Sequence, residues 1–242
     1  MTTVYWAAAA LALISAIEAA LELARDRSPV LAAWTLSMMA MSASLAIAAA
    51  APAVMRDGSG PAASACASLG IIGTWAFTEA LATRADGTRR IADTMATPLL
   101  GGASALLLLL GLRWAASHGT GDARFSQLAT IMVGLTLMAY YVPGLSRIAL
   151  LASQRARSIP AGWTRNAMRI VSASACAELV LFTIRSALLV AHACGMGVSE
   201  PAIPAISVLQ GVAMICGVGG LVAGPIIMAI TRRCGSWLQS QS

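Results

Sequence analysis

Seven long apolar runs occupy most of the chain, and short polar segments separate them. No water can hydrogen-bond the backbone inside a bilayer, so an apolar run of about 20 residues predicts a membrane-spanning helix. The predicted spans cover residues 4–24, 30–51, 62–83, 94–117, 127–152, 167–192 and 203–230. The expected fold is therefore an all-α, polytopic membrane bundle of seven transmembrane helices.

Arginine is distributed unevenly between the two sets of connections. Of the 16 basic residues, all of them arginines, the richer set of loops and the C-terminus hold Arg25, Arg27, Arg84, Arg89, Arg90, Arg155, Arg157, Arg165, Arg169, Arg232 and Arg233. The poorer set holds Arg56 and Arg124, with Arg113 close to a helix end. The positive-inside rule then predicts an outside N-terminus and a cytoplasmic C-terminus.

One membrane domain is expected over residues 1–233, followed by a short cytoplasmic tail at residues 234–242. The first apolar run has no arginine before it and is long for a signal peptide, so we interpret it as the first span. The many alanines and arginines and the absence of lysine are typical of a GC-rich bacterial genome. We therefore expect a multi-pass protein of the bacterial inner membrane.

Composition excludes several classes of function. A chain that is 58% hydrophobic and 11% charged is far from a soluble domain, and without lysine it cannot form a Schiff base with retinal. The five cysteines show no CxxC pair or metal-ligand spacing, so we expect neither a metal ion nor another cofactor. Because the basic charge follows topology, nucleic-acid binding is not expected, whereas the basic segment 155–169 is expected to bind anionic lipids.

Ionisable groups inside spans are the main candidates for function, because they are costly in hydrocarbon and usually face a bundle interior with a partner. Glu18 lies one turn deeper than Glu22, which we interpret as a rim partner of Arg25. Glu79 lies about one turn from the basic end of the third span, as either a rim acid or a cavity acid. Glu18 and Glu79 are therefore candidate site residues.

A proline precedes a charge in the fifth predicted span, which reads Tyr140-Tyr141-Val-Pro143-Gly-Leu-Ser-Arg147. Proline removes a backbone donor and clashes with the preceding turn, which predicts a kink with free carbonyls near residue 139. A broken helix beside a buried charge is a feature of transporter binding sites. Arg147, Tyr140 and Tyr141 are therefore candidate ligand-binding residues, with simple packing as the alternative.

The deepest charges occur in the sixth predicted span. Glu178 and Arg185 are seven residues apart, so they share a stripe of the helix and are separated by about 10 Å along its axis. They form either a structural ion pair or a site for a substrate or proton. The final predicted span contains Gly220 and Gly224, whose spacing predicts close helix packing or a homodimer.

The segment from Ala139 to Arg147, the arginine-rich turn at residues 155–169 and the Glu178 to Arg185 stretch resemble an uncharacterised actinobacterial group of seven-helix membrane proteins usually labelled transporters. Larger members of that group carry a cytoplasmic extension after the seventh helix. This sequence ends near Arg233, so the resemblance implies a truncated form without that extension.

Two functional hypotheses follow, with a scaffold that has no turnover as a third. The first is a small-solute transporter or membrane sensor whose cavity is lined by Glu178, Arg185 and Arg147. The second is a membrane enzyme for a lipid or isoprenoid, resembling small seven-helix terpene cyclases, in which Glu79 or Glu178 donates a proton. The low aromatic content, 5%, argues against a cation-stabilising chamber.

Overall fold

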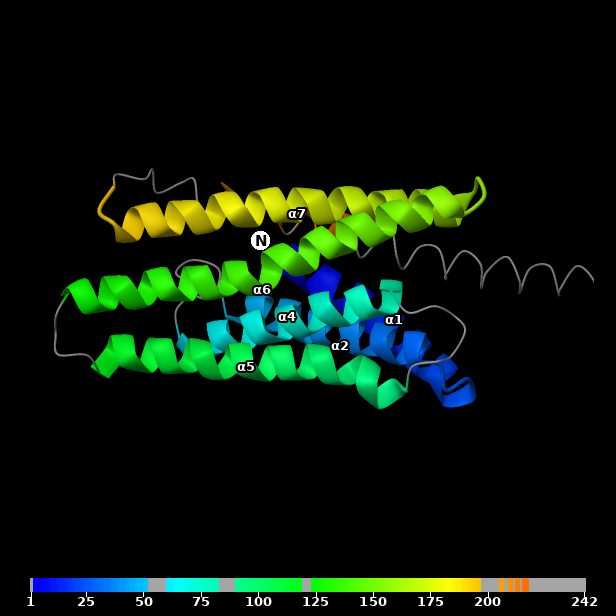
Figure 1. Ribbon diagram of the computed structural model, residues 1–242, viewed down its shortest axis with the longest axis horizontal. Helices are drawn as coiled ribbons and strands as arrows, with labels where there is room; N and C mark the ends of the chain where they lie inside the picture. The colour runs from blue at the N-terminus through cyan, green and yellow to red at the C-terminus, as the bar shows by residue number, and fades with distance from the viewer. Residues whose placement is uncertain are drawn as a thin grey trace, which may run out of the picture.

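The computed structural model describes residues 2–51, 60–82, 90–118 and 123–196, together with short helical pieces at 205–206, 209–210, 212–213 and 215–217. The long helices are α1 (Thr2–Arg25), α2 (Pro29–Ala50), α4 (Gly60–Ala82), α5 (Ile91–His118), α6 (Ala123–Ser158) and α7 (Trp163–Ala193) (Figure 1). All six are long and apolar enough to cross a membrane.

Six of the predicted spans are therefore confirmed as helices. Most of the seventh, residues 203–230, lies outside the described residues, as do Gly220, Gly224 and the predicted tail at 234–242. The helices α6 and α7 extend beyond the apolar runs that predicted them, so that the polar segment between those runs shrinks to residues 159–162. A helix satisfies its own backbone hydrogen bonds in water as well as in lipid, so its end need not coincide with the end of the apolar run.

Local signals fix several helix ends. Pro29 begins α2, where its missing N–H group costs no helical bond, and Arg25 lies in the last turn of α1, where a cation favours the helix dipole. After α7, Gly195 adopts a φ of 75°, and the amide of Met196 donates to the carbonyl of Ala191 at 3.0 Å. That left-handed glycine ends the helix.

The helix α4 lies at the centre of the bundle. It packs against α2, α5 and α6, while α1 packs on α2 and α7 packs along α6. Figure 1 shows the helices running roughly along the long axis, with α7 beside α6 at one side of the molecule. Among the described helices, α7 has close backbone packing only with α6.

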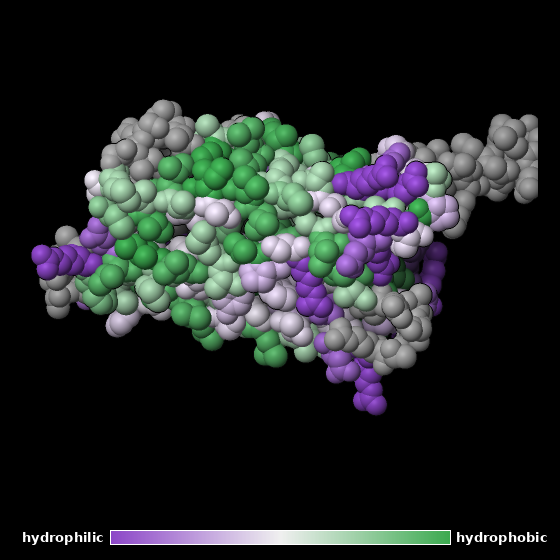
Figure 2. All heavy atoms as spheres, turned by 45° about the horizontal axis from the view of Figure 1, so that its top comes forward, coloured by the Kyte–Doolittle hydropathy of each residue, from purple (hydrophilic) through white to green (hydrophobic). Residues whose placement is uncertain are grey.

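Small residues fill the interior and large apolar residues cover the outside. Most buried apolar residues are alanines, whereas Leu107 and Leu100 are 73% and 69% exposed. This is the reverse of a soluble protein, and it is typical of helices that pack closely through small side chains and present leucine to lipid. Figure 2 shows hydrophobic residues over the middle of the molecule, with most hydrophilic ones at its ends.

Serine hydroxyls link neighbouring helices through their backbone carbonyls. Ser42 of α2 donates to Ala9 at 2.9 Å, Ser37 of α2 donates to Gly73 at 2.8 Å, and Ser68 of α4 donates to Gly102 at 2.6 Å. Small residues let the helices approach closely enough for these bonds to form. They join α1, α2, α4 and α5 into one scaffold.

Helix α6 is continuous and contains Pro143 near its middle, and Figure 1 shows its ribbon bending near the middle of the helix. The expected kink is present, and beside the carbonyl of Ala139 that Pro143 leaves without a helical donor, Trp75 Nε1 of α4 donates to the carbonyl of Tyr140 at 3.2 Å. A side chain from α4 thus hydrogen-bonds to the turn that the proline disrupts.

Candidate ligand cavity

A cavity of about 860 Å³ lies inside the bundle, bordered by all six long helices and by Gln210, Ala213 and Gly217. Its volume is within the range of small-molecule sites, about 300–1,000 Å³, and its walls are mainly apolar. It separates much of α7 from α1, α2 and α4. Several ionisable side chains, among them Glu178 and Arg185, lie on its walls.

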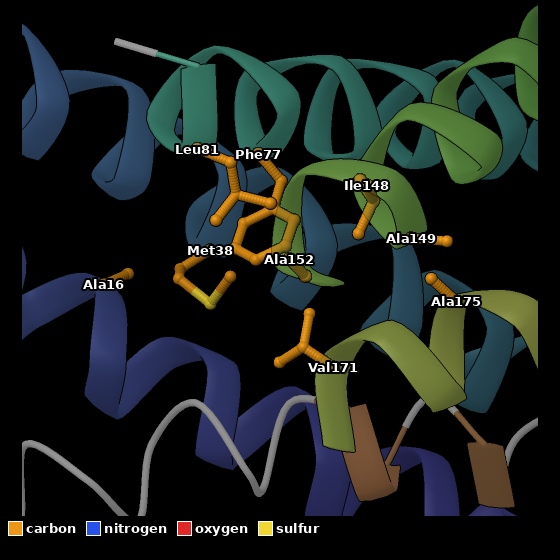
Figure 3. Close-up of a cluster of buried hydrophobic side chains, with 9 residues drawn as sticks. All are labelled: Ala16, Met38, Phe77, Leu81, Ile148, Ala149, Ala152, Val171 and Ala175. Carbon is orange, nitrogen blue, oxygen red and sulfur yellow. The ribbon is translucent and has the colours of Figure 1, made fainter. Parts of the chain in front are cut away.

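A cluster of buried apolar side chains, which we call the floor (Figure 3), lies at one end of the cavity and contributes Met38, Phe77, Ile148, Val171 and Ala175 to its lining. The floor consists of Ala16, Met38, Phe77, Leu81, Ile148, Ala149, Ala152, Val171 and Ala175. Met38 is fully buried, Phe77 is nearly so, and the ring of Trp34 meets that of Phe77 edge-on at 5.7 Å. Here side chains of α7 reach α2 and α4, on the side of the bundle where α6 ends in Arg155 and Arg157.

The opposite end of the cavity reaches the protein surface. Pro61, Ser117 and Thr130 line it and are exposed, as are Leu110 and Trp114, at 37% and 65%. These residues form the mouth. Tryptophan at such a level is typical of the interface between lipid and water.

Arg185 projects from α7 into the cavity. Its Nη1 donates to Gln210 Oε1 at 3.4 Å, a long contact, and its buried Nε has no hydrogen-bond partner among the described residues. Buried polar groups normally have partners. The guanidinium therefore retains hydrogen-bonding capacity inside an apolar cavity.

Two aromatic side chains hold the cavity wall between α4, α6 and α7. Tyr141 donates from its hydroxyl to the carbonyl of Ala67 at 3.0 Å, and its ring lies 5.0 Å from that of Phe182. The hydroxyl lies so close to Gly70 that a Cβ atom there would be 2.0 Å away. Gly70 is thus required for this position of Tyr141.

A group of ionisable side chains surrounds Arg185. Tyr5 of α1, Cys66 of α4, Tyr141 of α6 and Glu178 of α7 all lie near enough to interact with it electrostatically. Cys66 also contacts α2, where its thiol donates to the carbonyl of Ser44 at 3.4 Å. Four helices therefore bring polar groups to one part of the cavity.

The structure brings together some of the predicted site residues. Glu178, Arg185 and Tyr141 line the same cavity. Tyr140 points instead toward α5, where its hydroxyl and that of Ser104 lie 2.7 Å apart, and Arg147 is exposed and does not line the cavity.

The predicted acids outside α7 lie elsewhere. Glu18 is exposed on α1, and Glu79 is buried in α4 at 6% exposure without lining the cavity. Glu79 and Glu178 therefore do not line the same cavity, and the cavity gives no support to a catalytic role for Glu79.

Sequence reasoning missed four cavity residues: Tyr5, Cys66, Arg113 and Gln210. Arg113 carried a signal, since it is one of the few arginines of the poorer set and lies close to a helix end, and here it donates to Ser64 Oγ of α4. The other three lie at positions that only the packing of several helices reveals. In the described part of the chain, no group of three or more His, Cys, Asp or Glu side chains is placed to hold a metal ion.

Six apolar helices, small residues inside and leucines outside define an integral, multi-pass membrane protein. No family model, curated protein or solved structure matches the chain.

Proposed function

We propose that this protein binds a small molecule in its intramembrane cavity and acts as a transporter or membrane sensor. The observation that carries the proposal is the cavity of about 860 Å³ with Arg185 and Glu178 on one wall. Charged side chains are costly within a membrane and mark functional sites by default. An apolar cavity with a few convergent polar groups is typical of small-molecule sites.

The arginine pattern supports a cytoplasmic location for the end with the floor, in a bacterial inner membrane. At that end, Arg157 and Arg169 line a groove of about 290 Å³ between α6 and α7, together with Ser153 and Ser172. Cations at this level attract anionic headgroups. The mouth then opens toward the outer surface.

Native mass spectrometry of the purified full chain tests the proposal. We expect a non-covalent small-molecule adduct on the wild type and its loss in Arg185→Gln, because the variant removes the guanidinium from the cavity. Arg124→Gln is the matched control, since Arg124 is exposed and does not line the cavity. No adduct on the wild type, or an equal adduct on Arg185→Gln, contradicts the proposal.

One observation favours the enzyme alternative. Although aromatic residues are few, Tyr5, Phe77, Trp114, Tyr141 and Phe182 all line the cavity that contains Glu178. Aromatic faces stabilise cations, and a carboxylic acid in an apolar chamber can serve as a proton donor. This arrangement supports a proton-initiated reaction on a linear isoprenoid.

The enzyme alternative has a separate test. Membranes that contain the protein should convert a linear isoprenoid, and Glu178→Gln should abolish the conversion while Glu18→Gln, on the exposed face of α1, retains it. The absence of product from a panel of linear isoprenoids contradicts this alternative.

A further inference from the structure

We propose that the ligand of the cavity is an amphipathic anion, with a phosphate or carboxylate head beside Arg185 and a long apolar chain that extends toward the floor. This inference rests on the proposed function, because it names the class of molecule that the same cavity binds. It is argued from the shape of the cavity, its charge and its mouth.

The polar and apolar parts of the cavity are separated along its length. Arg185 and Val171 both line it from α7, and their separation of 14 positions corresponds to about 21 Å of helix. Around Val171 the cavity ends on Met38, Phe77 and Ile148 of the floor. A small polar solute would leave this deep apolar part without a complementary group, whereas an alkyl chain fits it.

The charged part of the cavity favours an anion. Among its described lining residues are two arginines, Arg113 and Arg185, and one carboxylate, Glu178, so positive charge is in excess. The unused Nε of Arg185 adds a donor. A guanidinium binds phosphate and carboxylate through paired hydrogen bonds, which are stronger than bonds between neutral groups.

Both arginines lie near the mouth. Arg113 is five residues from the end of α5, and Arg185 is eight residues from the end of α7, which places them about 8 and 12 Å from helix ends on the same side of the bundle. An anionic head at this level remains near water while its chain is buried. This is the orientation that an amphiphile takes in a bilayer leaflet.

The mouth also fits entry from lipid. Leu110 and Trp114 line it and are exposed, one turn apart on α5, and on the same helix Leu107 is 73% exposed. Exposed apolar side chains of α5 thus lie beside the mouth of the cavity. A molecule with an apolar chain can pass along them without crossing water.

Binding of radiolabelled hexadecyl phosphate to the full chain in nanodiscs of zwitterionic lipid tests the inference. We expect saturable binding that is about tenfold weaker in Arg185→Gln, since a hydrogen bond to a charged group is lost. Arg124→Gln should bind as the wild type does. Glu178→Gln should bind several-fold more tightly, because the one carboxylate that opposes the anion is removed.

Two competitors separate the parts of the ligand. Hexadecanol and inorganic phosphate should each compete poorly, as neither has both a charge and a chain. Equal competition by hexadecanol, equal competition by inorganic phosphate, or no saturable binding of hexadecyl phosphate to the wild type overturns the inference. Each result leaves the adduct test of the proposed function to be decided separately. If Arg185→Gln fails to fold, unchanged or weakened binding in Glu178→Gln still overturns the anion assignment.

Discussion

The helices α4 and α7 are both long and apolar enough to cross a membrane, but they have different surroundings. In their most apolar windows, 61% of α4 is buried and only 28% of α7. Helix α4 packs against α2, α5 and α6, whereas α7 has close backbone packing only with α6 and faces the cavity. The scaffold is thus built around α4, whereas α7 carries Glu178 and Arg185, two of the three charged side chains among the described residues that line the cavity.

The difference shows how one helix bundle can provide both a rigid scaffold and a binding site. Glycine and serine allow α4 to be closely packed and hydrogen-bonded on several sides. Side chains of α7 meet those of α2 and α4 in the floor, and the cavity lies beside Glu178 and Arg185. Changes at α4 should therefore alter stability, and changes at the α7 face should alter binding.

The largest effect on stability is expected at the floor, where α4 and α7 meet. Phe77→Ala should lower the free energy of unfolding by about 3 to 5 kcal/mol, because the lost transfer free energy of the ring and the void it leaves both contribute. Unfolding in mixed detergent micelles measures the change. Phe125→Ala is the control, because Phe125 is 45% exposed and should change stability little; equal losses in the two variants would contradict the assigned floor.

The amount of fold that sequence predicts follows from the membrane itself. Apolar length predicts the six described spans, because lipid permits only helices with satisfied backbones. Hydropathy does not predict the polar continuation of α6 through Arg155 and Arg157, because a helix can also form in water, where no apolar run is needed. Pro143 predicted a bend, but the donor from Trp75 depends on a helix more than 60 residues away.

The site was partly predictable for a similar reason. Glu178 and Arg185 were found because charge in a span is unusual, and their helical spacing put them on one stripe. Arg147 satisfies the same rule yet is exposed and outside the cavity, because burial depends on which face α6 turns toward α4. Cys66 and Tyr5 lie in apolar runs without any charge or motif that marks them. Their place in the cavity lining depends on how several helices pack together.

A smaller effect is expected where α4 meets α5. A methyl group at Gly102 would lie 2.1 Å from Ile72 Cγ1, whereas at neighbouring Gly101 it would meet nothing within 4 Å. Gly102→Ala should therefore cost about 1.5 kcal/mol by overpacking, and Gly101→Ala should be neutral or stabilising because alanine favours helix. Thermal unfolding of the matched pair measures both; similar values would mean that α4 and α5 are not so closely packed.

The smallest expected effect concerns a single hydrogen bond. Ser68→Ala removes the bond from α4 to the carbonyl of Gly102, and interhelical bonds in membranes contribute about 0.6 kcal/mol on average. Thr183→Ala on α7 removes only a bond to Leu179 within the same helix and should cost less. A larger loss from Thr183→Ala in detergent unfolding would reverse the comparison between α4 and α7.

The most direct test of the cavity is the alkylation of Cys66, which lines it, in sealed proteoliposomes by a water-soluble thiol reagent. One variant retains Cys66 as its single cysteine, with the other four replaced by alanine. A second variant has all five native cysteines replaced and carries Ala161→Cys, which marks the arginine-rich end in the exposed turn before α7. The account predicts that Cys66 reacts from the side opposite to residue 161, through the mouth, because the buried apolar side chains of the floor lie at the other end. Reaction of Cys66 from the same side as residue 161, or from neither side, would contradict it.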